Sequence, residues 1–216
     1  EYLTVMTDII HEEGGTIDKY EGDAIIAFWN APLDVPDHAV KAVRAALRCQ
    51  SKLAELRPIF KKRVGAELHM RIGINTGTAV VGNLGSHKRF DYTMIGDAVN
   101  LAARLEGANK QFGTFCMISQ ATKELIGSHF SLRELARLTV MGRKEPVTVY
   151  EPATSEDYEV RKKIFKKFGQ GLQLFYKGDL VRGREAFEEI RTHDAAAAAY
   201  AEKCRTLIAT ERNDWK

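Results

Sequence analysis

The chain has 216 residues, of which 44% are hydrophobic and 28% are charged, and its formal net charge is +3. These proportions are typical of a globular protein with one domain and an appendage, or with two small domains. No run of about 18 apolar residues is present, which argues against a membrane span, and the acidic opening EYLTVMTDIIHEE is no signal peptide. The charge is too small to indicate a nucleic-acid partner. Three widely spaced cysteines favour reduced thiols over disulfides or zinc.

The first 153 residues predict alternating helices and strands. Apolar residues at helical spacing indicate a helix over 2–13, and a hairpin follows around the turn 21–23. Asp37 can cap a long helix that reaches about residue 55. Strands and helices that alternate without long parallel βαβ repeats indicate an α+β fold, with one sheet and helices on a face. The later predicted elements are strands over 67–75, 78–82, 90–94, 114–119, 130–140 and 147–151, turns at 75–77 and 82–88, and helices over 96–110 and 120–126.

The composition changes after Pro152, so we divide the chain into a domain over 1–153, a polar and acidic linker over 154–159, and a helical tail over 160–216. The segment GLQLFYKGDLVRGREAFEEI in the tail has aromatic and small residues at the spacing of a helix–turn–helix. It resembles a single tetratricopeptide-like repeat. One such helix pair cannot bury its own apolar face, so we expect it to dock on another surface.

The segment DKYEGDAIIAFW places a carboxylate at a tight turn between two β-rich runs. Asp23 directly follows Gly22, so its side chain can project from the edge of a sheet toward a cation. Proteins commonly bind Mg²⁺ through one or two carboxylates together with phosphate oxygens. Aspartate also favours turns for purely conformational reasons. The spacing alone therefore leaves both a turn former and a metal ligand open.

A second segment, MRIGINTGTAVVGNLGSHKRFDYTMIGDAVNLAARLE, leads from glycine-punctuated strands into a predicted helix. Asn100 and Arg104 are four residues apart and therefore share one face of that helix. A neutral amide and a permanent cation on one face suit the binding of a ribose and a polyphosphate, because a planar guanidinium can hold two phosphate oxygens. The alternative is an asparagine in an early helical turn and a surface cation.

Together, the two segments resemble the catalytic domain of class III adenylate and guanylate cyclases, and the resemblance covers about residues 1–153. It implies a ferredoxin-like nucleotide cyclase fold within the α+β class, with a central, mostly antiparallel sheet. It also implies a reaction in which the ribose 3′ oxygen attacks the α-phosphate and pyrophosphate leaves. By the family's pattern of lysine, two residues, glycine and aspartate, Asp23 would bind a metal ion. Asn100 would orient the ribose, and Arg104 would stabilise charge on the attacked phosphate.

The same resemblance indicates which residues would bind the purine base and the terminal phosphates. Lys19 can only donate hydrogen bonds, which suits N1 of adenine, whereas guanylate cyclases resemble one another in having glutamate there. Thr93 occupies the second purine-selecting position, and its hydroxyl can accept a hydrogen bond from N6. This pair predicts ATP as the substrate and cyclic AMP as the product, for intracellular signalling. In the segment VMGRKEPVTVYE the cation for the terminal phosphates would be Arg143 or Lys144, and the sequence leaves both open.

The resemblance implies two Mg²⁺ or Mn²⁺ ions per site and a homodimer with head-to-tail two-fold symmetry. One protomer would supply the metal-binding aspartates, and the other would supply Lys19, Thr93, Asn100 and Arg104. The family's second metal aspartate lies on a strand before the helix that opens this chain, which leaves the activity of the isolated chain open. We also expect an upstream sensory or regulatory region. The expected location is the cytoplasm, alone or as the cytoplasmic part of a larger, membrane-attached protein.

Other classes of function stay open on the sequence. A cyclase-like fold without catalysis could act as a regulatory or scaffold module, and an aspartate on the preceding strand of the full-length protein would decide between the two. The helical tail could be a protein-binding module in its own right. A ferredoxin-like RNA-binding domain is disfavoured, because no aromatic pair of the required type sits on adjacent strands.

Overall fold

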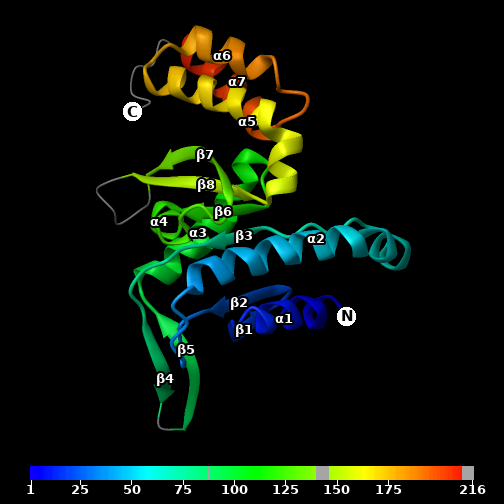
Figure 1. Ribbon diagram of the computed structural model, residues 1–216, viewed down its shortest axis with the longest axis vertical. Helices are drawn as coiled ribbons and strands as arrows, with labels where there is room; N and C mark the ends of the chain where they lie inside the picture. Colours follow the sequence, from blue (N-terminus) through cyan, green and yellow to red (C-terminus); the bar gives the residue numbers. More distant parts are fainter. Residues whose placement is uncertain (87, 140–145, 211–216) are drawn as a thin grey trace.

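The computed structural model describes residues 1–86, 88–139 and 146–210. Its mixture of strands and helices confirms the predicted α+β class (Figure 1). None of the described helices is long and apolar enough to cross a membrane. The helices are α1 (Tyr2–Glu12), α2 (His38–Val64), α3 (Asp97–Phe112), α4 (Gln120–Ile126), α5 (Ser155–Tyr176), α6 (Leu180–Glu188) and α7 (Ala195–Ala209). The strands are β1 (Thr16–Glu21), β2 (Ala24–Phe28), β3 (Ile72–Ile74), β4 (Val80–Ser86), β5 (Arg89–Ile95), β6 (Cys116–Ser119), β7 (Ser131–Leu138) and β8 (Val147–Ala153).

The central sheet has four strands in the order β3-β6-β8-β7. β3 runs parallel to β6, whereas β8 is antiparallel to both β6 and β7. The hairpins β1–β2 and β4–β5 form two separate ladders. Residues 75–77 lie in the connection between β3 and β4, as predicted, but these two strands belong to different ladders, because β3 pairs with β6 and β4 pairs with β5. The predicted turn at 82–88 is largely strand, since β4 continues to Ser86.

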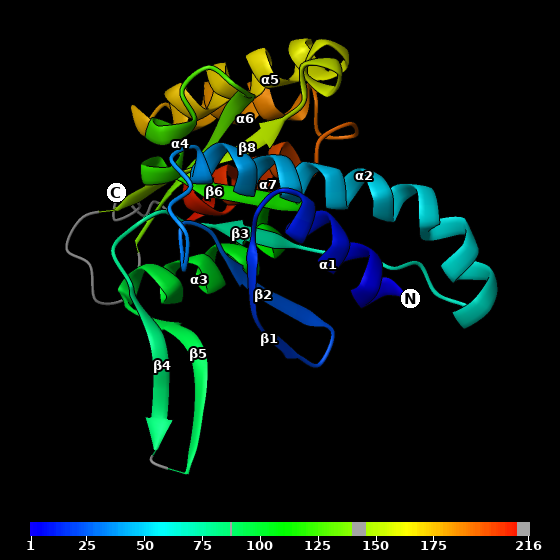
Figure 2. The same ribbon diagram turned by 60° about the horizontal axis from the view of Figure 1, so that its bottom comes forward.

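Helices cover both faces of the central sheet, as Figure 2 shows. Alternate residues of a strand point to opposite faces, and the two faces have separate cores. Met117 and Val149 belong to a large core with α3, α5, α6 and α7. Their neighbours Ile118 and Tyr150 belong to a smaller core with α2 and α4. The sheet is therefore the middle of three layers, and the C-terminal tail supplies part of one outer layer.

The β1–β2 hairpin packs against α1 and α2 and forms no ladder with the described strands of the central sheet. Met6 and Ile9 of α1 and Leu53 of α2 form the centre of this third apolar cluster. Ile25 of β2 packs against it, and the hydroxyl of Tyr20 in β1 is hydrogen bonded to Thr7 of α1 at 2.8 Å. One face of the hairpin is thus covered by helices.

Helix α3 approaches β3 so closely that no side chain fits between them at Gly73. A Cβ atom there would lie 2.2 Å from the carbonyl oxygen of Ala102 and 2.3 Å from the amide nitrogen of Glu106. The buried Asn109 of α3 fixes the contact, because its Nδ2 donates to the carbonyl of Ile72 at 3.0 Å and its Oδ1 accepts from Thr114 at 2.8 Å. The sequence of β3 therefore determines where α3 lies.

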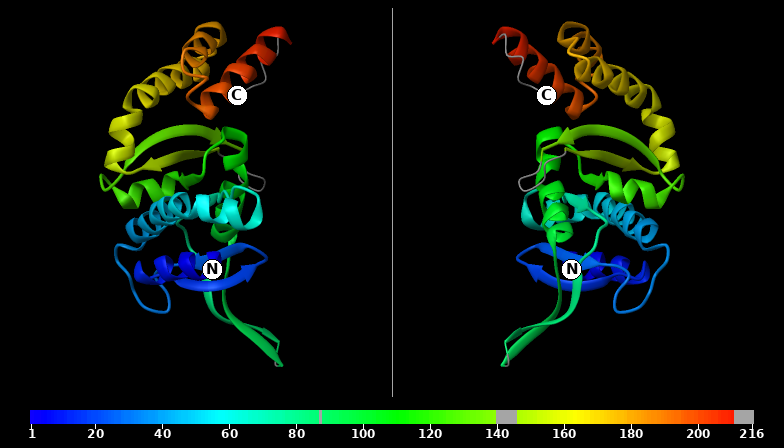
Figure 3. Two further views of the ribbon diagram at one scale, coloured as in Figure 1. Left: turned by 90° about the vertical axis from the view of Figure 1, so that its right-hand side faces the viewer. Right: turned by 90° about the vertical axis from the view of Figure 1, so that its left-hand side faces the viewer.

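The β4–β5 hairpin extends away from the rest of the protein, at the opposite end from the tail helices (Figures 1 and 3). Large apolar side chains on this arm are exposed: Val80 by 65%, Phe90 by 63% and Ile95 by 60%. Val80 and Ile95 pair at the base of the arm, and Phe90 lies on its other face near the tip. Exposed apolar groups on a projecting element are typical of contact with another molecule.

The tail is helical as predicted, but residues 155–159 form the first turns of α5 rather than a linker. Thr154 caps this helix, because its hydroxyl accepts a hydrogen bond from the amide of Asp157 at 3.1 Å. A capped helix start with acidic residues in its first turn is favoured over an irregular segment. The tail docks on the central sheet, as expected of helices that cannot bury their apolar faces alone.

A buried ionic network joins the tail to the sheet. Arg133 of β7 donates to Glu151 of β8 and to Asp194 at the start of α7, both at 2.6 Å. The side chains of Arg133 and Asp194 are only 4% and 1% exposed. Arg161 of α5 completes the network, with Nη1 3.1 Å from Glu151 and Nη2 3.7 Å from Asp194. Each charge is paired, so removal of one partner would leave a buried charge unpaired.

We therefore predict that Asp194→Ala destabilises the protein by about 3–5 kcal/mol, because it leaves Arg133 buried without a partner. The matched control is Asp179→Ala. Asp179 caps α6 as Asp194 caps α7, but it belongs only to an exposed ion pair with Arg182. Loss of this cap should cost about 1 kcal/mol. Urea unfolding of both variants measures the difference, and equal losses would show that the network adds nothing beyond the cap.

Candidate functional site

Lys19 and Asp23 lie four positions apart on the β1–β2 hairpin. The Lys19 side chain in β1 is 46% exposed. Asp23 lies in the turn after Gly22, whose φ of +64° is in the left-handed region that glycine adopts without strain. Asp23 is exposed, and its carboxylate has no hydrogen bond or ion pair to any residue that the structure describes. The turn therefore presents a carboxylate that is available to a ligand.

Tyr2 of α1 is close enough to Asp23 for the two side chains to interact electrostatically. Burial raises the pKa of the Tyr2 phenol, and the negative charge of Asp23 raises it further. The Tyr2 hydroxyl donates to the sulfur of Met70, just before β3, at 3.2 Å. The hairpin turn, the start of α1 and the segment before β3 therefore lie near one another.

The carboxylate of Asp23 fits the chemistry of a Mg²⁺ or Mn²⁺ ligand. Such ions take oxygen ligands and often use only one or two carboxylates when phosphate oxygens complete the shell. In residues 1–86, 88–139 and 146–210, no three His, Cys, Asp or Glu side chains are grouped to hold a metal ion. Within this part of the chain, the predicted metal site consists of one carboxylate.

Thr93 lies in β5, opposite Gly82 of β4, and is half-buried. Strand β5 is a neighbour of β1, and the ring of Tyr92 lies 6.1 Å from that of Phe28 in β2. The regular register of the β4–β5 ladder puts Thr93 on the face away from Tyr92. The strands that carry the two predicted purine-reading residues, Lys19 and Thr93, therefore lie close together.

Asn100 and Arg104 are both exposed on α3. The opposite side of this helix is buried through Leu101, Leu105 and Phe112. The four-residue spacing puts the amide and the guanidinium one turn apart on the outward face. The two residues therefore share one face of α3, and that face is exposed.

The loop between β3 and β4 contacts the first turn of α3, a contact that the sequence did not predict. The amide Nδ2 of Asn75 donates to the carbonyl of Ala98 at 2.9 Å. The hydroxyls of Thr76 and Thr122 are 3.0 Å apart, which ties the same loop to α4. A Cβ at Gly77 would lie 2.9 Å from that of Ala98. The sequence INTG, which predicted only a turn, is the one local pattern that marks these contacts with α3 and α4.

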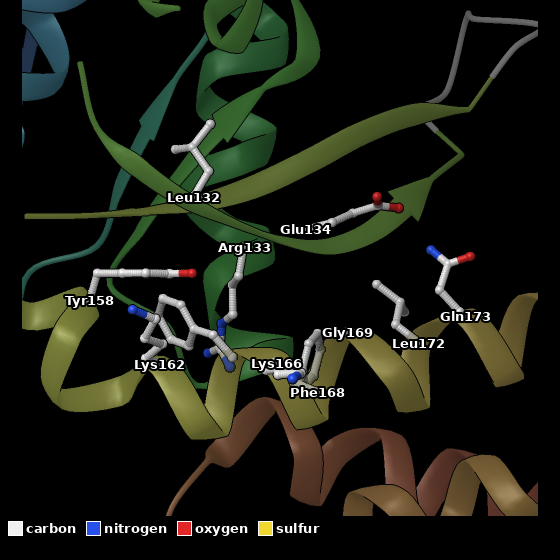
Figure 4. Close-up of a pocket in the computed structure, with 11 residues that line it drawn as sticks. Leu132, Arg133, Glu134, Tyr158, Lys162, Lys166, Phe168, Gly169, Leu172 and Gln173 are labelled. Carbon is white, nitrogen blue, oxygen red and sulfur yellow. The ribbon is translucent and has the colours of Figure 1, made fainter. Parts of the chain in front are cut away.

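Two hollows in the structure lie away from these residues. A cavity of about 350 Å³ lies between β7 and α5, where Arg133, Lys162, Lys166 and Phe168 point toward it (Figure 4). An open hollow of about 530 Å³ lies near the tip of the β4–β5 arm, around Asn83 and Phe90. Among the described residues of the predicted site, none lines either hollow.

The remaining candidates add little. Arg143 and Lys144, the predicted contacts to the terminal phosphates, lie outside the described residues. The three cysteines are free and buried, as expected of reduced thiols. Burial raises the pKa of Cys49 and of Cys204 to about 11, so neither thiol is a ready nucleophile.

Comparison with known proteins identifies the family. Residues 1–151 match the model of the "Adenylate and Guanylate cyclase catalytic domain". The chain belongs to this family. The cyclase match ends within β8, so it includes the hairpin, the arm and α3, and leaves out α5, α6 and α7.

Relatives at similar identity include cyclases of both kinds. "Adenylate cyclase 1" of Rhizobium meliloti is 36% identical over 151 residues, which are 70% of this chain and 23% of that protein. The solved structure of the adenylyl cyclase CyaB from P. aeruginosa is 35% identical, with a TM-score of 0.65 over 71% of this chain and 79% of that chain. The guanylyl cyclase Cya2 is also 35% identical, with a TM-score of 0.63 over 71% and 77%. The fold is therefore that of a nucleotide cyclase domain, and the chain spans about a quarter of the length of its curated relative from Rhizobium meliloti.

Proposed function

We propose that this chain is the catalytic domain of an adenylate cyclase, which converts ATP to 3′,5′-cyclic AMP and pyrophosphate in intracellular signalling. The observation that carries the proposal is the match of residues 1–151 to the cyclase family, supported by four exposed side chains at positions of the family's pattern. Lys19 and Asp23 are exposed on one hairpin, and Asn100 and Arg104 are exposed on one helix face. Only the purine preference separates adenylate from guanylate cyclases, and Lys19 and Thr93 support ATP.

In this proposal each side chain has one task. Lys19 donates a hydrogen bond to N1 of adenine, and the hydroxyl of Thr93 accepts one from N6. Asn100 holds the ribose so that its 3′ oxygen lies behind the α-phosphate. Arg104 stabilises the negative charge that develops on this phosphate, and Arg143 or Lys144 binds the terminal phosphates. The protein thus contributes position and charge rather than a covalent intermediate.

The proposed cofactors are two Mg²⁺ or Mn²⁺ ions per site, with Asp23 as one ligand. When bound, such ions lower the pKa of the attacking hydroxyl and neutralise phosphate charge. The support for this assignment is the exposed carboxylate in the turn after Gly22, which is unpaired among the residues that the structure describes.

We also propose that two copies of the chain form the active site across a head-to-tail two-fold interface. Two observations support a second copy. Lys19, Asp23, Asn100 and Arg104 are exposed and line neither of the two hollows described above, and the β4–β5 arm carries exposed apolar side chains. A two-fold axis would create two equivalent sites.

The remaining assignments are also proposals. The tail would be a tetratricopeptide-like helical unit, which its α5–α6 helix pair supports. An upstream sensory or regulatory region would control the pairing of two copies, since relatives are several times longer than this chain. The domain would act in the cytoplasm, on its own or attached to a membrane by other parts of the protein.

The purine assignment predicts that Lys19→Glu combined with Thr93→Cys shifts the preference of the full-length enzyme from ATP toward GTP. The ratio of kcat/KM for ATP to that for GTP should fall by about a hundredfold or more, because a mismatched purine leaves buried polar groups unpaired. Assays of both nucleotides in parallel measure this ratio. Lys62→Glu, the same charge change at the exposed end of α2, should leave it unaltered. An unchanged ratio in the double variant would refute the purine-reading roles, and a wild-type protein inactive on both nucleotides would favour the scaffold function.

The role of Arg104 predicts a selective loss of turnover. Arg104→Ala should lower kcat by about 10²–10³, because one preorganised positive charge at the reacting phosphate is lost. KM for ATP should change little, since the base and the ribose are held by other residues. Lys110→Ala is the control, because it removes an exposed cation from the last turn of the same helix. Equal turnover of wild type and Arg104→Ala would remove this arginine from the mechanism.

The proposed interface predicts that specific activity depends on protein concentration. Dilution should abolish activity over the range in which sedimentation shows dissociation into monomers. Phe90→Asp should move both the loss of activity and the dissociation into monomers to higher protein concentration, because it puts a charge on the exposed apolar arm. Leu125→Asp, at an apolar residue of α4 that is 55% exposed, is the control. Specific activity that stays constant down to full dissociation would rule out a shared site.

A further inference from the structure

Strand β1 contains a β-bulge immediately before Lys19. Ile17 pairs with Ala27 of β2, and Lys19 pairs with the next residue, Ile26. Asp18 is therefore an extra residue without a partner in the ladder. Bulges of this kind re-aim the side chains that follow them.

The bulge decides which face of the hairpin carries Lys19. Tyr20 pairs with Ile25, and both lie on the face that α1 and α2 cover. Lys19 alternates with Tyr20 and so lies on the opposite face, which the helices leave open and where Phe28 contacts Tyr92 of β5. In an unbroken register that continued from Ile17, Lys19 would pair with Ile25 and point toward the helices, because a slip of one residue exchanges the two faces.

The side chain of Asp18 is buried beside that of Lys19. It is only 3% exposed, and its Oδ2 lies 3.8 Å from Nζ of Lys19. Its other oxygen, Oδ1, is buried and has no hydrogen-bond partner among the residues that the structure describes. A buried carboxylate is costly unless a cation or several donors compensate it. The ammonium of Lys19 is the cation that the structure places beside it.

We propose that Asp18 is a positioning residue of the nucleotide site, which fixes the ammonium of Lys19 on the open face of the hairpin and thereby sets its purine preference. The inference rests on the proposed reading of adenine by Lys19. A lysine has many rotamers, and fixing its charged end before binding removes part of the entropic cost of recognition. The carboxylate acts through Lys19 and does not itself contact the base.

Binding of nucleotides that cannot be cyclised tests the inference without turnover. 3′-Deoxy-ATP and 3′-deoxy-GTP lack the attacking oxygen, and calorimetry on the full-length protein measures their affinities. Asp18→Asn keeps the shape of the side chain but removes its charge. It should weaken binding of 3′-deoxy-ATP by about tenfold and leave 3′-deoxy-GTP nearly unaffected. Asp18→Glu, which restores the charge, should recover most of the preference.

Two further comparisons separate positioning from a general structural role. Glu21→Gln removes the same charge from an exposed position of the same strand and should leave both affinities unaltered. In a Lys19→Met background, Asp18→Asn should have no further effect on the ratio of the two affinities, because the residue that it positions is gone. An equal effect with and without Lys19, or equal losses in Asp18→Asn and Asp18→Glu, would overturn the proposal. If Asp18→Asn does not fold, Asp18→Ser replaces it with the same expectations.

A measurement that needs no nucleotide keeps this inference distinct from the proposed function. Side-chain ¹³C relaxation reports the order of the Lys19 Cε in the free protein. Asp18→Asn should lower this order, and Glu21→Gln should not. Wild-type protein that binds both nucleotides equally would refute the adenine preference in the proposed function. Unchanged order of Lys19 in Asp18→Asn would refute the role of Asp18, whichever nucleotide the site binds.

Discussion

The backbone contact between β3 and α3 is the constraint on which the arrangement of the candidate site depends. At Gly73 the strand and the helix approach so closely that even one methyl group would overlap the backbone of α3. Asn109 holds the same contact from the helix side, through hydrogen bonds to Ile72 and Thr114. With one side of α3 fixed on the sheet, its other side must face outward, and that side carries Asn100 and Arg104. The chemistry proposed for these two residues therefore begins with a glycine that takes no part in it.

The hairpin is held by a different part of the protein. Its inner face packs on α1 and α2, and no strand pairing joins it to the described central sheet. The candidate residues thus belong to three parts of the fold: the hairpin with Lys19 and Asp23, the β4–β5 arm with Thr93, and the sheet with α3. The position of the hairpin relative to the sheet depends on side-chain packing around α2, which contacts both. This division suits a site whose assembly responds to changes elsewhere in a larger protein, since packing contacts shift more easily than a continuous hydrogen-bonded ladder.

The tail is joined to the sheet by apolar burial and by charge. Phe168 and Phe187 lie in one core with Met117 and Val149 of the sheet, while Arg133 sits 4.8 Å from the ring of Phe168 and binds Glu151 and Asp194. The network fixes the position of the tail more than it adds to the free energy of unfolding, because the cost of burying the charges offsets much of their attraction. It fixes one docking position for three helices that could slide over an apolar surface. The tail is therefore a structural part of the cyclase domain's outer layer in this chain.

Sequence patterns were enough to predict the class of fold, most helices and the identity of the candidate residues. Helical periodicity predicted α1, α3 and α4 nearly to their ends, and the motif around Asn100 and Arg104 pointed to one exposed helix face. Local signals do this well because capping, spacing and turn preference act within a few residues. The roles of Lys19, Thr93, Asn100, Arg104 and Asp23 remain predictions of the family resemblance.

The tertiary structure alone decided which strands pair and which way their side chains face. The INTG segment signals a turn, yet β3 pairs with the distant β6, because pairing is set by burial of both faces and not by the nearest neighbour. Helix α5 begins at Ser155 because Thr154 caps it. The polar sequence around this cap predicted a linker instead. Most of all, the position of Lys19 on the open face follows from a bulge at Asp18. A one-residue change of register leaves the local pattern almost unaltered, so only contacts with the helices and the partner strand can select it.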